Sequence, residues 1–170
     1  MRKYLYALVL AGLISAALMA PEDLHAQQST GSPSLRIIGI AGNEVSITAA
    51  EWAKLPRASV KVVDHGEQAT FEGVPARELL KLVGAPLGPD LRGPNLSVYV
   101  LAEASDGYQV VYTLTEFDTG FTDGLILVAD RKNGEALGPK EGPLRMVVPW
   151  EKRQARSLRW LTVLRVRMAP

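Results

Sequence analysis

The chain of 170 residues contains no cysteine. This absence excludes disulfide bonds, cysteine nucleophiles, cysteine-ligated zinc, iron–sulfur clusters and any metal held by a protein thiolate. An exported protein with this composition would have to be stabilised by packing alone.

Long apolar runs are also scarce. The main one, residues 7–20, follows Arg2 and Lys3 and precedes a small residue at Ala26. This order is typical of a secretory signal peptide, predicted over residues 1–26, and the run is short for a membrane span. We therefore expect a periplasmic or secreted protein, which would be attached to a membrane only if this segment stayed uncleaved.

The remainder of the chain has the length of one ordinary domain. Residues 27–34 are polar and are expected to be a flexible linker. Residues 35–169 can bury a single core and are predicted to form one domain.

Acidic residues become rare towards the C-terminus. Residues 35–141 contain ten Lys and Arg against fifteen Asp and Glu, whereas the chain from Gly142 onward has seven basic residues and only Glu151. A positive region of this kind suits a small anion, a phosphate or an acidic partner protein. Export and the lack of interleaved aromatic residues argue against nucleic acid as a partner.

Short apolar segments alternate with turns along the domain. Thr48 with Glu51 and Thr113 with Glu116 have capping-box spacing, and Pro75 suits the start of a further short helix. Strands are expected at residues 35–40, 45–47, 60–63, 69–71, 96–102, 108–112, 125–129, 144–148 and 158–168. Many short strands with two or three short helices indicate an α+β, mostly β domain.

Arg145 is the one charged residue in an apolar segment that runs from Gly142 to Pro149. An arginine inside such a strand needs an anionic partner or a water-lined cleft to offset its desolvation. An ordinary pair with a carboxylate and a site for a bound anion are both open.

Several segments, in their order along the chain, resemble the molybdopterin-binding domain of the sulfite oxidase type, which is shared with the periplasmic methionine sulfoxide reductase catalytic subunit. They are Phe71-Glu72-Gly73-Val74-Pro75 leading into Leu79-Leu80, Asp106-Gly107-Tyr108, Leu127-Val128-Ala129 with Asn133-Gly134, residues 142–149, and Ala155-Arg156-Ser157-Leu158-Arg159-Trp160. The resemblance implies a single-domain sulfite oxidase-like fold.

The resemblance also implies a cofactor. In this family an anionic pterin holds molybdenum through its dithiolene, one protein cysteine completes the thiolate set, and the segment matching residues 155–160 helps to hold the pterin phosphate. The implied cofactor-binding candidates are Arg145, Arg156, Ser157, Arg159, Asp106 and Tyr108. For the arginines the alternative is a solvated strand face, and for Asp106 it is a turn residue.

The chain departs from the family pattern at two places. The family cysteine belongs to the segment matching residues 60–65, where this chain has Asp64 and His65 as candidate metal ligands or, alternatively, as surface residues of a turn. The family's glycine-rich turn is replaced by residues 150–154, whose side chains add bulk where a pterin would approach the backbone.

Two functions follow as hypotheses. The first is an exported oxidoreductase-type domain that binds a molybdenum–pterin cofactor or another small anion and, if it is an enzyme, transfers oxygen atoms. The second is a non-catalytic envelope module that binds a ligand or a partner protein and has lost molybdenum chemistry, because the missing cysteine is the catalytic element of the fold.

Overall fold

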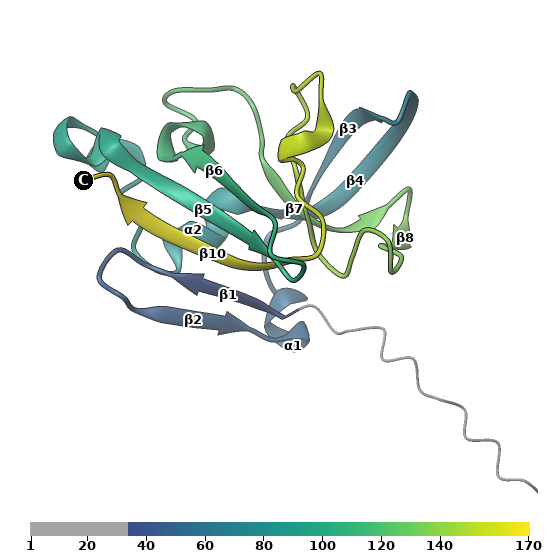
Figure 1. The fold of residues 1–170 in the computed structure, drawn as a ribbon, viewed down its shortest axis with the longest axis horizontal. Helices are drawn as coiled ribbons and strands as arrows, with labels where there is room; N and C mark the ends of the chain where they lie inside the picture. Colours follow the sequence, from purple (N-terminus) through teal and green to yellow (C-terminus); the bar gives the residue numbers. More distant parts are fainter. Residues whose placement is uncertain (1–33) are drawn as a thin grey trace, which may run out of the picture.

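The computed structural model describes residues 34–170, so the predicted signal peptide and nearly all of the predicted linker lie outside the described residues. Within 34–170, no helix is long and apolar enough to cross a membrane. Two sheets and a few short helices make up this part of the chain (Figure 1), which confirms the mostly β prediction.

The first sheet has five strands in the order β2-β1-β10-β5-β6. Its strands are β1 (Leu35–Ile38), β2 (Glu44–Ile47), β5 (Val98–Ala104), β6 (Gln109–Thr113) and β10 (Leu161–Met168). The last strand, β10, lies in the middle, parallel to β1 and antiparallel to β5. The two ends of the domain therefore meet in one sheet.

The second sheet has the order β3-β4-β7-β8, with β9 paired to β7. Its strands are β3 (Ala58–Asp64), β4 (Glu67–Pro75), β7 (Leu127–Lys132), β8 (Glu135–Ala136) and β9 (Arg145–Val147). Alternate residues of β7 enter different cores: Val128 joins the larger core against the first sheet, and Leu127 joins a smaller core around Phe71. Burial on both faces explains the continuous apolar run that predicted this strand.

Both predicted capping boxes are present. Thr48 caps α1 (Ala49–Trp52) together with Glu51, and Thr113 with Glu116 starts the 3-10 helix η3 (Leu114–Phe117). The remaining helices are α2 (Ala76–Lys81), which follows Pro75, and the 3-10 helices η1 (Gly88–Asp90), η2 (Gly93–Ser97) and η4 (Gln154–Arg156).

Two irregularities interrupt regular strand pairing, one in each sheet. At Gly73 the register of β4 with β7 shifts, and a Cβ there would lie 2.0 Å from the carbonyl oxygen of Val128, so only glycine fits. In β10 a bulge between Leu161 and Val163 places both of these residues in the interior, as Leu164 and Val166 are. The bulge interrupts the strict alternation that the sequence predicts from residue 158 to 168.

Candidate functional site

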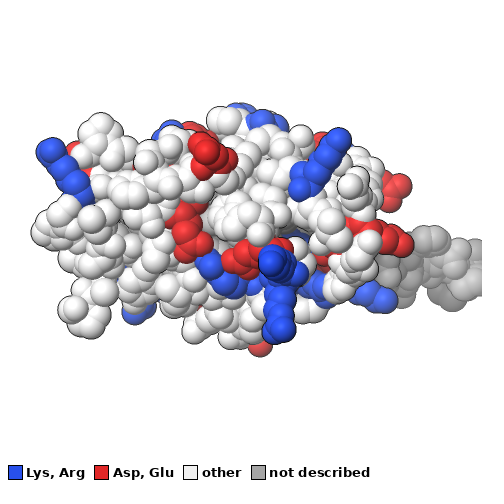
Figure 2. Space-filling view, turned by 90° about the horizontal axis from the view of Figure 1, so that it is seen from above, with Lys and Arg blue, Asp and Glu red and all other residues white. Residues whose placement is uncertain are grey.

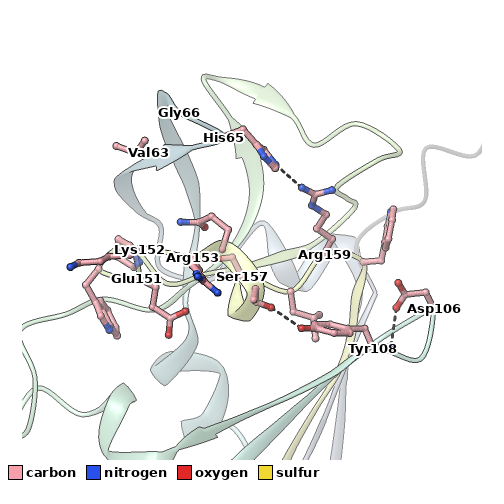
Figure 3. Close-up of a pocket in the computed structure, with 16 residues that line it drawn as sticks. Val63, His65, Gly66, Asp106, Tyr108, Glu151, Lys152, Arg153, Ser157 and Arg159 are labelled. Atoms are coloured by element: carbon pink, nitrogen blue, oxygen red, sulfur yellow. Dashed lines mark hydrogen bonds between the residues drawn. The ribbon is translucent and has the colours of Figure 1, made fainter.

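An open cleft of about 810 Å³ lies where three connections meet (Figure 3). The end of β3 and the turn after it contribute Val63 and His65, the β5–β6 turn contributes Asp106 and Tyr108, and residues 149–155 and 157–160 form the remaining wall. Four of the predicted site residues line this cleft, namely Asp106, Tyr108, Ser157 and Arg159, and so does the candidate metal ligand His65. Arg145, Arg156 and Asp64 are not among its lining residues.

Backbone strain is concentrated at this cleft. Among the described residues, three that are not glycine have positive φ, and two of them, His65 (φ 52°) and Trp160 (φ 51°), line the cleft. The third, Asn133, lies in the β7–β8 hairpin turn, where this conformation is common. Strained residues often mark functional sites, and here both strained residues line the same cleft.

Arg159 carries the best-placed positive charge in the cleft. Its Nη2 lies 2.8 Å from Nε2 of His65. Because a guanidinium can only donate hydrogen bonds, His65 accepts with Nε2 and its ring is neutral in this arrangement. None of the described carboxylates pairs with Arg159, so its remaining donors can serve a ligand.

Lys152 and Arg153 add two exposed cations to the same wall, and neither pairs with a carboxylate within residues 34–170. The nearby Glu151 is already bound to Arg156. Asp106 accepts a hydrogen bond from the backbone N–H of Tyr108, as expected for a turn residue, and ion-pairs with none of the described arginines. The cleft therefore has more free positive than free negative charge.

Three of the seven basic residues in the C-terminal segment are compensated by carboxylates. Arg145, Arg156 and Arg165 each pair with an acidic residue from earlier in the chain. Figure 2 accordingly shows basic and acidic side chains interspersed on one face of the molecule, with no continuous basic patch.

Arg156 holds the predicted phosphate-binding segment in place. Its guanidinium lies 2.6 Å from Glu116 and 2.9 Å from Glu151, and stacks 4.6 Å from the ring centroid of Tyr112. Burial works to lower the pKa of Arg156, but the two carboxylates outweigh it and raise the pKa. These contacts leave little of the side chain for a ligand.

Two tyrosine hydroxyls reinforce this attachment. Tyr112 donates to the carbonyl of Arg156, and Tyr108 donates to the carbonyl of Ala155 at 3.1 Å. Burial raises the pKa of Tyr112, so its hydroxyl stays protonated and remains a donor. Ser157 is also buried at the wall of the cleft, and its Oγ accepts a hydrogen bond from the backbone N–H of Val148.

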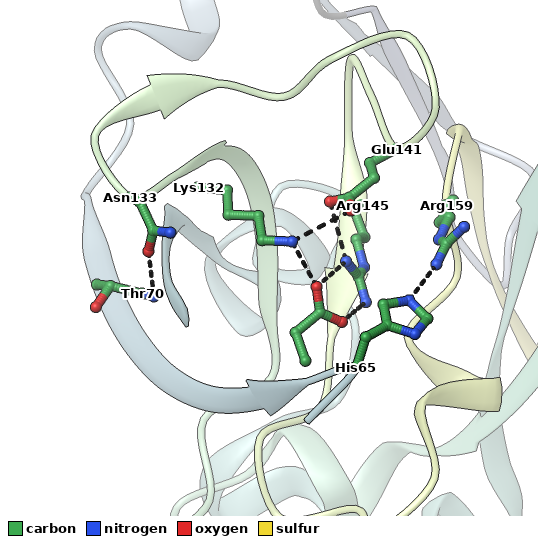
Figure 4. Close-up of polar contacts among 8 residues, drawn as sticks. His65, Thr70, Lys132, Asn133, Glu141, Arg145 and Arg159 are labelled. Carbon is green, nitrogen blue, oxygen red and sulfur yellow. Dashed lines mark hydrogen bonds and ion pairs between the residues drawn. The ribbon is translucent and has the colours of Figure 1, made fainter. Parts of the chain in front are cut away.

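Arg145 and Asp64 form a buried ion pair, and the partly exposed side chains of Lys132 and Glu141 complete a cluster with them (Figure 4 shows Arg145, Lys132 and Glu141). Arg145 Nη2 is 3.0 Å from Asp64 Oδ1, and Arg145 Nη1 is 3.0 Å from Glu141 Oε2. Lys132 Nζ is 2.6 Å from Asp64 Oδ2 and 3.3 Å from Glu141 Oε1. The anionic partner that the sequence required for Arg145 is thus a pair of carboxylates, 81 and 4 residues away.

These residues do not fit a molybdenum ligand set. The Asp64 side chain is fully buried and its two oxygens are held by Lys132 and Arg145, so the carboxylate is directed away from the cleft. His65 faces the cleft, but within residues 34–170 no group of three His, Cys, Asp or Glu side chains could hold a metal. The thiolate of the family is absent, and of the two candidate ligands in residues 60–65 Asp64 is engaged by Lys132 and Arg145, whereas His65 lines the cleft.

Sequence reasoning missed part of the cleft. Lys152 and Arg153 appeared in the sequence only as part of a bulky replacement for a glycine-rich turn. Their convergence with His65 depends on how the fold places residues 149–160 across the cleft from the turn after β3.

Comparisons with known proteins bear on the family and the fold of the chain. The family model described as "Oxidoreductase molybdopterin binding domain" matches residues 63–170.

The solved structure of the sulfane dehydrogenase SoxCD from Paracoccus pantotrophus is similar to this chain with a TM-score of 0.60 and 19% sequence identity, over 79% of this chain and 38% of that one. The chain therefore spans well under half of the SoxCD chain it matches, and at this identity the similarity shows the fold alone. No curated protein matches the sequence. Because the family model covers more than half of its residues, the chain belongs to the oxidoreductase molybdopterin-binding domain family.

Proposed function

We propose that this domain is a non-catalytic member of its family that binds a small anionic ligand in the cleft. The observation that carries the proposal is the convergence of Lys152, Arg153 and Arg159, which line one cleft without carboxylate partners among the described residues. Arg145 and Arg156, by contrast, are already neutralised.

The donors of the cleft suit a phosphate or carboxylate group. The guanidinium of Arg159 is oriented by neutral His65 at 2.8 Å, and it offers planar, forked donors that match an oxyanion. Lys152 and Arg153 add long-range attraction. Trp150, Trp160 and Tyr108 provide flat apolar walls, so the preferred ligand joins an anionic group to a flat body, a class that includes a pterin phosphate.

Loss of molybdenum chemistry is the second part of the proposal. It rests on the absence of cysteine and on the engagement of Asp64 by Arg145 and Lys132. Oxygen-atom transfer at a molybdenum centre is the alternative that family membership keeps open. Export through a signal peptide at residues 1–26, and a partner protein in the envelope, belong to the proposal as expectations from the sequence.

The test is a binding titration with inorganic phosphate and pyrophosphate by calorimetry. Arg159→Ala should weaken binding by roughly tenfold or more, since it removes charge-assisted hydrogen bonds. Arg167→Ala is the matched control, because Arg167 is exposed near the end of β10 and does not line the cleft. Arg156→Ala is a poor probe because it would also release η4.

Equal affinity in wild type and Arg159→Ala would remove Arg159 from the site. If the wild type bound neither probe nor a pterin phosphate, anion binding in the cleft would be refuted.

A further inference from the structure

Two cations of the second sheet converge on a single carboxylate. Arg145 comes from β9 and Lys132 from β7, and both lie within 3.0 Å of an oxygen of Asp64 at the end of β3. The side chains of Arg145 and Asp64 are 1% and 0% exposed. Burying charges this deeply costs several kcal/mol unless they are paired and hydrogen-bonded.

The cations are also held by contacts that do not involve Asp64. Lys132 Nζ lies 5.4 Å and the Arg145 guanidinium carbon 4.8 Å from the centroid of the Phe71 ring, where the ring face attracts positive charge. Glu141 binds both cations as well. Their positions are therefore fixed by several elements of the second sheet.

The charges of this cluster balance only when Asp64 is included. Without it, two cations would face the single carboxylate of Glu141. Arg145 Nε is buried and donates to no described residue, so the guanidinium still has an unused donor. The set of groups that remains without Asp64 is a preformed site for one negative charge.

We propose that Arg145 and Lys132 form a binding site for a small carboxylate-type monoanion, and that the chain fills this site with its own residue, Asp64. The site is separate from the cleft, and the inference does not depend on the ligand proposed there. Asp64 acts as an internal ligand, in the segment where the family's metal-binding cysteine is expected.

The proposal predicts chemical rescue. Asp64→Ala removes one carbon and two oxygen atoms, which are the heavy atoms of formate, and leaves a space of that size between the two cations. Formate entering this space would restore both ion pairs. Asp64→Asn keeps the volume of the side chain and leaves no such space.

The experiment measures the thermal unfolding midpoint in sodium formate and in sodium chloride at equal ionic strength. In chloride, Asp64→Ala should unfold on the order of 10 °C below wild type, because it leaves buried cations short of a partner. Formate at roughly tenfold excess over its Kd should raise that midpoint by a few degrees relative to chloride. Wild type and Asp64→Asn should show no difference between the two salts.

Two further variants make the result specific. Glu67→Ala removes an exposed carboxylate from the same β3–β4 hairpin and should not respond to formate. Adding Arg145→Met to Asp64→Ala should abolish the response. If Asp64→Ala does not fold in chloride, its refolding yield in formate and in chloride gives the same comparison. Equal behaviour of Asp64→Ala in the two salts, or an undiminished response with Arg145→Met, would overturn the proposal.

Discussion

At the scale of single residues, Asp64 links the stability of the domain to pH. Burial works to raise the pKa of its carboxyl, but hydrogen bonds from Arg145 and then Lys132 outweigh burial and lower the pKa to about 2. The folded pKa is below the unfolded value of 3.8, so the ionised carboxylate stabilises the native state above that value. This stabilisation is lost as the pH falls from about 4 towards 2.

We therefore expect the stability difference between wild type and Asp64→Asn to be largest near neutral pH and to shrink between pH 4 and pH 2. Urea unfolding at a series of pH values measures it, and contributions from other acidic groups cancel in the difference. Glu67→Gln serves as the control for an exposed carboxylate of the same hairpin. A difference that stays constant down to pH 2 would contradict the role assigned to Asp64.

The sequence predicted which kind of partner a residue needs, but it did not predict which residue supplies that partner. A lone arginine in an apolar strand required an anion, and Arg145 has two. Which carboxylates supply it depends on the pairing of β3, β4, β7 and β9, because Asp64 lies 81 residues away. Arg156 and Arg159 look equivalent in the sequence, yet only Arg159 lines the cleft.

At the scale of elements, the attachment of η4 to β6 and η3 decides the shape of the cleft wall. Two tyrosine hydroxyls and the ion pair of Arg156 with Glu116 hold the three residues of η4. The sequence predicted β6 and η3 from alternation and a capping box, both of which are local signals. It could not predict that their side chains hold η4, because that contact joins residues about 40 positions apart.

Tyr112→Phe removes the hydroxyl but keeps the buried ring, so it isolates this attachment. The free energy of unfolding should fall by roughly 1–2 kcal/mol, because the carbonyl of Arg156 loses its donor. Hydrogen exchange in residues 149–160 should become faster. Tyr99→Phe on β5 is the control, since its hydroxyl bonds to no side chain or backbone group of residues 34–170. An equal loss in both variants would show that the hydroxyl of Tyr112 does not hold η4.

At the scale of the whole molecule, the chain has the fold of the molybdopterin-binding family, and Asp64, in the segment expected to carry the family's cysteine, takes part in an internal ion-pair cluster. Order along the chain carried the resemblance, and the family match over residues 63–170 bears it out. Whether the chain holds a metal cofactor could not be predicted from the order of these segments. That question depends on whether Asp64 faces the cleft or the interior.

The protein purified from a host that makes the molybdenum cofactor should contain no stoichiometric molybdenum. Elemental analysis measures the metal, and fluorescence of the oxidised pterin released on denaturation measures the pterin. Pterin without metal would identify the cleft ligand and leave the proposed function intact. Molybdenum and pterin near one per chain would contradict the loss of molybdenum chemistry and would justify assays of oxygen-atom transfer.

The position of β10 has a consequence for how this chain becomes a folded protein. Its partners are β1 at one end of the domain and β5 in the middle, and it separates them in the sheet. Until β10 leaves the ribosome, β1–β2 and β5–β6 are two hairpins that cannot join, and the larger core stays open. The first sheet and the larger core can therefore form only once β10 has been synthesised, because they depend on pairing between strands that lie far apart in the sequence.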